Sequence, residues 1–132
     1  QGYAISMVKH GLENKIKALM ISNRSEFENK MTELLKKNEV DGICCANEST
    51  LKLVLEIMRI QNDKSWGTIP VTAFSARTVK KLSNYPLLYI IDQCAEKIGK
   101  QAANLLLKRV EFGYDNTFKI KEVKTKIVWM SK

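Results

Sequence analysis

At 132 residues, 45% of them apolar, the chain has the length and composition of one folded domain with a hydrophobic core, which excludes intrinsic disorder. The 22 lysine and arginine residues outnumber the 14 acidic ones and give a formal net charge of +8, which favours an anionic partner. No apolar run reaches the roughly 18 residues of a membrane span, and no signal peptide opens the sequence, so a membrane protein is not expected.

The spacing of apolar residues alternates between helical and strand-like values along nearly the whole chain. In the first half it predicts a helix over residues 2–13, a strand over 15–22, a helix from residue 22 or 23 to 38, a strand over 40–46 and a helix over 47–61. The second of these helices is expected to bury Phe27, Met31, Leu34 and Leu35. In the second half we expect a strand over 69–74, a short helix over 78–82, a strand over 87–91, a helix over 93–110 and a strand over 118–130.

This alternation predicts an α/β fold with a parallel β-sheet flanked by helices on both faces. In such sheets small ligands bind beyond the carboxyl ends of the strands, at the crevice where the strand order reverses. The candidate positions are therefore those that directly follow the predicted strands: residues 22–24, 47–49 and 75–77.

Four residues at these positions are candidate ligand contacts. Asn47 and Glu48 follow a buried strand and open a helix, so they serve either as a helix cap and a favourable first-turn charge, or as hydrogen-bonding groups for a ligand. Ser75 and Arg77 occupy the matching place after the next strand. Ser75 is equally a candidate helix cap, and Arg77 a candidate solvated turn residue.

The helix that begins at Asn47 is more apolar than coverage of one sheet face requires. Either its own domain encloses it, or its outer side meets another subunit. The candidate residues for a dimer interface are Leu51, Lys52, Leu55 and Glu56.

Several kinds of chemistry lack a signature in the sequence. Neither nucleotide-binding fingerprint is present, metal-ligand spacing is absent, and the one histidine, His10, is expected on the surface without a nucleophile nearby. We therefore expect no enzyme, no catalytic residue, no metal and no cofactor. The three cysteines, at positions 44, 45 and 94, are expected to be buried free thiols of a cytoplasmic protein.

The closest approach to a basic cluster lies in the predicted last strand. Its lysines are interpreted first as the solvated face of that strand, with nucleic-acid contact as the alternative. They are Lys119, Lys121, Lys124 and Lys126.

Five segments resemble, in order and at similar spacing, the effector-binding domain of the LacI/GalR (lactose-repressor) family of transcriptional regulators. VDGICCANESTLKLVLEIMR resembles the strand that ends in Ala-Asn-Asp and the helix after it. IPVTAFSA resembles the strand that ends in Gly-Phe-Asp, and SNYPLLYIIDQCAEKIGKQAANLLLKRV the crossover and the Met-Gly-x-x-Ala helix. IKEVKTKIVW takes the place of the closing strand, and QGYAISMVKHGLENKIKALMIS resembles the Gly-Tyr-x-x-Ala-Leu helix with its strand.

The resemblance implies the C-terminal lobe of a two-lobed periplasmic-binding-protein-like domain, with a small, sugar-like effector between the lobes and a homodimer as the assembly. Operator DNA would be bound through an N-terminal helix-turn-helix absent from this chain. Asn47 would touch the effector, and Ser75 stands where the family often has an effector-binding Asp. Glu48 replaces the usual Asp, and the Arg expected near the end of the last strand is replaced in IVWMSK.

The resemblance also implies how the chain is divided. Residues 1–92 and 113–132 would form the C-terminal lobe, and residues 93–112 a crossover helix that normally packs on the N-terminal lobe. Without that lobe the helix exposes apolar side chains, and we expect it to pack on its own lobe or on a second chain. The alternative to a regulator is a sugar-binding receptor of a transport system with the same fold; an enzyme on a doubly wound sheet ranks third.

Overall fold

The computed structural model describes residues 2–61, 63–75, 85–113 and 119–130. These residues divide into two compact units, Gln1–Glu39 and Val40–Lys132, which we describe separately. The predicted short helix over 78–82 and the candidate residue Arg77 lie outside the described residues. Among the helices that the structure does describe, none combines the length and the hydropathy needed to cross a lipid bilayer.

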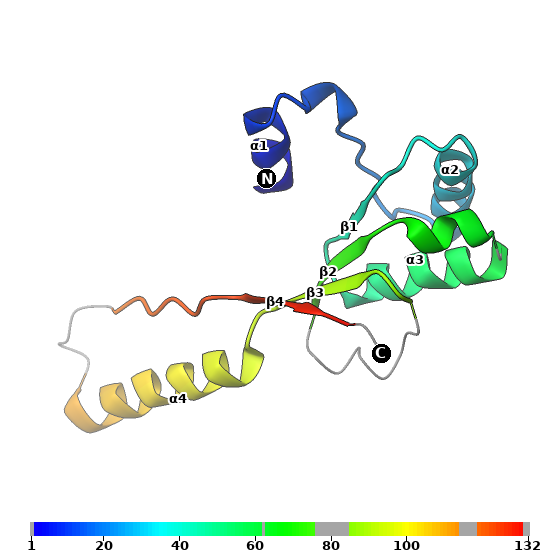
Figure 1. Cartoon of the computed structure of the whole chain (residues 1–132). Helices are drawn as coiled ribbons and strands as arrows, with labels where there is room; N and C mark the ends of the chain where they lie inside the picture. The colour runs from blue at the N-terminus through cyan, green and yellow to red at the C-terminus, as the bar shows by residue number, and fades with distance from the viewer. Residues whose placement is uncertain (1, 62, 76–84, 114–118, 131–132) are drawn as a thin grey trace. The chain divides into compact units, whose positions relative to one another are not determined.

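The first unit contains α1 (Gly2–Lys9), the short 3₁₀ helix η1 (Glu13–Lys15) and α2 (Arg24–Lys36), drawn in blue to cyan in Figure 1. Asn23 caps α2, because its side-chain oxygen accepts hydrogen bonds from the backbone N–H groups of Ser25 (2.9 Å) and Glu26 (3.4 Å). The predicted inward residues Phe27, Met31 and Leu35 are buried, and Leu34 is half-buried. The prediction of this helix is therefore confirmed, with its start fixed at Asn23.

The predicted strand over residues 15–22 does not form. Residues 16–21 have no regular structure, and Met20 is 90% exposed. A strand requires a neighbour for its backbone N–H and C=O groups, and within the described residues no strand pairs with this segment. The apolar run alone was therefore a misleading indicator of a strand.

The second unit is built on a four-stranded sheet in which the strands lie in chain order: β1 (Ile43–Cys45), β2 (Val71–Ser75), β3 (Leu88–Asp92) and β4 (Lys126–Trp129). The pairs β1–β2 and β2–β3 are parallel, which confirms the prediction for residues 43–92. Strand order does not reverse among these four strands, so the expected crevice at a reversal is absent from the part of the sheet that the structure describes.

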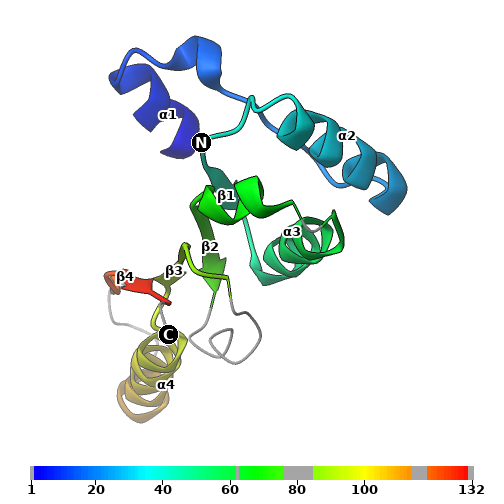
Figure 2. The ribbon, with the colours of Figure 1, turned by 45° about the vertical axis from the view of Figure 1, so that its right-hand side comes forward.

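The last strand departs from the prediction, because β4 is short and runs antiparallel to β3. Its first residue, Lys126, pairs with Asp92, the last residue of β3. Helix α4 (Ala95–Phe112) also begins at that end of β3 and projects away from the sheet (Figures 1 and 2). The returning chain therefore reaches the sheet at the carboxyl end of β3 and can only run back along it.

The core of the second unit lies between the sheet and α3 (Glu48–Gln61), which packs against β1 and β2. Alternate residues of β2 and β3 are buried, as expected for strands whose side chains alternate between two faces. Helix α3 contributes the buried side chains Leu51, Val54, Ile57 and Met58. In contrast, α4 buries none of its residues, so it does not supply the expected helical layer on the other face of the sheet.

Candidate functional site

The carboxyl ends of the three parallel strands lie at one edge of the sheet. Ser75 ends β2 and lies beside Asp92, which ends β3, while Cys45 at the end of β1 lies beside Ala73. Ser75 and Asp92 are 6% and 8% exposed. The parallel register therefore brings two buried polar side chains together, with the start of α3 as the next element at this edge.

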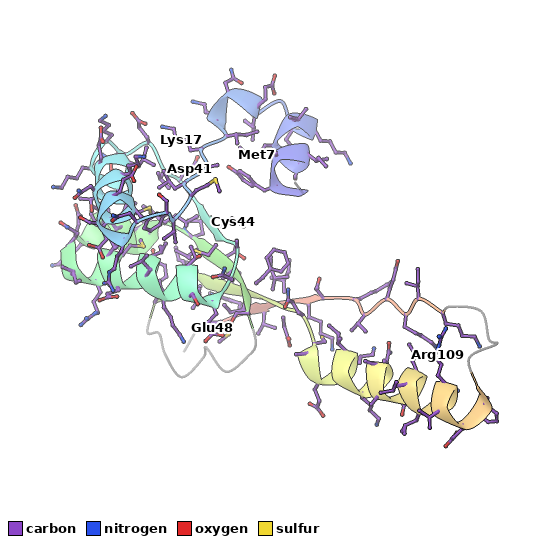
Figure 3. All side chains as sticks on the ribbon, turned by 180° about the vertical axis from the view of Figure 1, so that it is seen from behind. Met7, Lys17, Asp41, Cys44, Glu48 and Arg109 are labelled. Carbon is purple, nitrogen blue, oxygen red and sulfur yellow. The ribbon has the colours of Figure 1, made fainter. Side chains whose placement is uncertain are left out.

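Glu48 joins the start of α3 to the end of β2. The Ser75 hydroxyl donates a hydrogen bond to Oε2 of Glu48 at 3.0 Å, and Oε1 of Glu48 forms an ion pair with Nζ of Lys52, also at 3.0 Å. The Lys52 ammonium and the Ser75 hydroxyl lower the pKa of the Glu48 carboxyl below its ordinary value. This edge of the sheet therefore carries an ionised carboxylate held in a fixed position, which Figure 3 shows at the start of α3.

The sequence left two roles open for Asn47, and the structure shows one of them, the helix cap. Its side-chain oxygen accepts hydrogen bonds from the Thr50 backbone N–H (2.9 Å) and the Thr50 hydroxyl (3.1 Å), so it caps α3. The residue is exposed at the rim of the sheet. Its amide Nδ2 takes no part in the cap, and it can donate to a ligand without breaking the cap.

Asp92 belongs to the same edge and was missed by sequence analysis. Its Oδ1 accepts a hydrogen bond from the backbone N–H of Cys94 at 2.8 Å. Cys94 has a left-handed backbone (φ 54°, ψ 48°), which is uncommon for a residue other than glycine, and α4 starts directly after it. The signal that could have found Asp92 is its place directly after the strand predicted over residues 87–91, the same kind of position that identified Asn47 and Ser75.

The basic residues near the end of the chain do not form the predicted strand face. Lys119, Lys121 and Lys124 are exposed and lie before β4, which contains only Lys126. The interpretation of all four as one face of a strand is therefore wrong, because the strand begins eight residues later than predicted. Contact with nucleic acid stays a prediction.

The cysteines differ in their environments. Cys45 is 1% exposed, and burial raises the pKa of its thiol to about 12. Cys44 is exposed, which corrects the expectation that all three thiols are buried, and Cys94 is half-buried. All three are free, as predicted, and Cys44 and Cys45 alternate between the two sides of β1. No group of side chains suited to a metal ion occurs among the described residues, and His10 is exposed.

Of the four residues predicted for a dimer interface, the structure buries one and leaves three accessible. Leu51 is 0% exposed, so it is a core residue and offers a partner no contact. Lys52 is exposed and paired with Glu48, while Leu55 and Glu56 are half-buried. Of the two alternatives for this helix, enclosure by its own chain holds for Leu51, Val54, Ile57 and Met58.

Comparisons with protein-family models, with curated proteins and with solved structures find no match for this chain.

Proposed function

We propose that this chain is the effector-sensing part of a LacI-type transcriptional regulator, and that it binds a small, polyhydroxylated molecule at the carboxyl edge of its sheet. In such a regulator, effector contacts from two lobes favour one angle between them, and a dimer transmits that angle to DNA-binding heads. The support from sequence is the ordered resemblance of five segments to that family. The first of these segments departs from the family's pattern, because its predicted strand over residues 15–22 does not form.

The single observation that carries the ligand site is the meeting of Ser75, Glu48 and Asp92 at one edge. Ser75 bonds to Glu48 at 3.0 Å, and β2–β3 pairing sets Ser75 beside Asp92. In open α/β sheets small ligands bind outside the carboxyl ends of the strands, at a point where the strand order reverses. The described strands contain no such reversal, so the support for this edge is the set of polar side chains that meet there.

The chemistry of the edge favours hydroxyl groups as ligands. Ionised carboxylates accept hydrogen bonds from hydroxyls, and the Asn47 amide adds a donor at the rim. Carboxylates also repel phosphate and carboxylate ligands at short range. A neutral sugar or nucleoside therefore suits this edge better than an acidic metabolite.

The test is a two-dimensional amide NMR titration with neutral monosaccharides, disaccharides and nucleosides, each up to tens of millimolar because one lobe alone binds weakly. We expect shifts gathered at residues 45–49, 74–75 and 92–94, and their loss in Ser75→Ala and Glu48→Gln. Glu33→Gln is the matched control, because Glu33 also forms an ion pair with a lysine four residues later, at 2.6 Å. Binding is refuted if no probe shifts these residues at any concentration.

The regulator and the transport receptor differ in what is encoded upstream of Gln1. The coding sequence of a regulator contains a helix-turn-helix there, and that of a receptor contains a signal peptide. Sequencing this region separates the two functions, and neither result affects the NMR test of the ligand site.

A further inference from the structure

Helix α4 carries an apolar stripe that its own chain leaves uncovered. The stripe consists of Gly99, Ala102, Ala103, Leu106 and Val110, all of them exposed, with Leu106 at 63% and Val110 at 68%. These positions follow the i, i+3, i+4, i+7 spacing and span about 100° of the helix circumference, the width of a face that packs on another element. No charged side chain interrupts them.

The contacts that α4 makes with the rest of the chain lie on a different side of the helix from the stripe. Gln101, Leu105 and Arg109 are its half-buried residues, and Gln101 and Leu105 line a groove of about 480 Å³ together with Lys121 from the segment before β4. A Cβ atom built on Gly99 would meet nothing within 4 Å. The stripe is therefore an open surface, and the segment 119–125 does not cover it.

The sizes of the side chains along the stripe point to its occupant. The N-terminal half is small (Gly99, Ala102, Ala103), and the C-terminal half is large (Leu106, Val110). We propose that α4 pairs with α4 of a second copy of this chain, antiparallel, about a two-fold axis beside Ala102 and Ala103. In this pair Leu106 of each copy sits over Gly99 of the other, and Val110 sits over Ala95, so large side chains fill the space that small ones leave.

The helix dipoles agree with the antiparallel direction, because the two dipoles then run in opposite directions. A lipid surface fits the stripe less well, because membrane-bound helices present large apolar side chains and three of the five stripe residues are glycine or alanine. The other large apolar side chains that α4 exposes, Ile98, Leu107 and Phe112, lie outside the stripe.

The surface area that two paired α4 helices can bury predicts a weak dimer. An 18-residue helix is about 27 Å long, and one pair of such helices buries less than the roughly 800 Å² per partner of a standard stable interface. Association is therefore expected to depend on concentration in the micromolar range. This interface differs from the one predicted for α3, whose Leu51 is buried in its own chain.

Light scattering coupled to size-exclusion chromatography, over a series of concentrations, tests the proposal on the full chain. We expect a monomer–dimer equilibrium that Leu106→Glu shifts at least tenfold towards monomer. Ile60→Glu is the matched control, because Ile60 is 64% exposed on α3 and outside the stripe; it should leave the equilibrium unchanged. A chain that is monomeric at all concentrations, or an equal effect of both variants, overturns the proposal.

Two further variants separate this pairing from non-specific association. Gly99→Leu adds apolar surface and helix propensity, so it strengthens non-specific contact, but it blocks the site of Leu106 and should weaken the proposed pair. In a background with Cys44→Ser and Cys94→Ser, which removes the accessible free thiols, oxidation should cross-link Ala103→Cys into a dimer and leave Val110→Cys uncross-linked. Cross-linking of both variants indicates a parallel pair, and stronger association of Gly99→Leu indicates non-specific contact; either result overturns the proposal.

Discussion

Helices α3 and α4 both follow the carboxyl end of a parallel strand and both carry an apolar stripe, but only α3 is covered within the chain. Helix α3 buries Leu51, Val54, Ile57 and Met58, whereas α4 buries none of its 18 residues. Their starts differ too, since Asn47 caps α3 through its side chain and Cys94 precedes α4 without a side-chain cap bond. An amphipathic pattern therefore predicts that a helix forms and which face is apolar, but not what covers that face.

The largest expected difference between the two helices is in the stability lost when an apolar side chain of each is truncated to alanine. Leu51→Ala in α3 leaves a cavity and should lower the free energy of unfolding by about 2–5 kcal/mol. Leu106→Ala in α4 should change it by less than about 0.5 kcal/mol in dilute monomer, because that side chain is 63% exposed. Urea denaturation followed by circular dichroism measures both. Similar costs for the two variants would show that α4 is packed as tightly as α3.

The two helix starts give the next largest difference. Asn47→Ala removes the cap of α3 and should cost about 1 kcal/mol, whereas Asn47→Ser keeps a capping oxygen and should cost little. The same urea experiment applies. Equal losses for alanine and serine would mean that the 2.9 Å bond to the Thr50 N–H does not stabilise α3.

The start of α4 should respond in the opposite direction. Cys94 has φ 54°, a left-handed conformation that glycine adopts without steric cost. Cys94→Gly should therefore raise the free energy of unfolding by up to about 1 kcal/mol, while Cys94→Ala should give no gain. A loss of stability in the glycine variant would mean that the Cys94 side chain contributes more than its backbone strain costs.

The smallest expected effect is the pH dependence of the contact at the start of α3. The Lys52 ammonium and the Ser75 hydroxyl lower the pKa of Glu48 from its ordinary value of 4.5, so Glu48 binds fewer protons in the folded than in the unfolded state. Its stabilising contribution is therefore present above about pH 4.5 and is lost as pH falls below that value. The stability difference between the native chain and Glu48→Gln should shrink from pH 7 to pH 3. A difference that stays constant would contradict the ionic contact.

Much of the candidate site was predictable from local signals. Asn47 and Ser75 could be identified because each follows an apolar run of strand-like length and comes before residues that open a helix or a turn. Asp92 was missed although it directly follows the strand predicted over residues 87–91, the same position after a strand that identified Asn47 and Ser75. The bond between Ser75 and Glu48 joins residues 27 apart, and no local pattern predicts it.

The sequence by itself determined where α2, α3 and α4 form, that Asn23 and Asn47 precede helices, and that residues 43–92 make parallel strands. These features follow from side-chain spacing and capping within a few residues. Only the tertiary structure decided that residues 15–22 form no strand, that β4 runs antiparallel, and that α4 stays uncovered. Each of those outcomes depends on whether a distant segment supplies hydrogen bonds or an apolar surface, and the spacing of residues along one segment does not show whether its own chain supplies either.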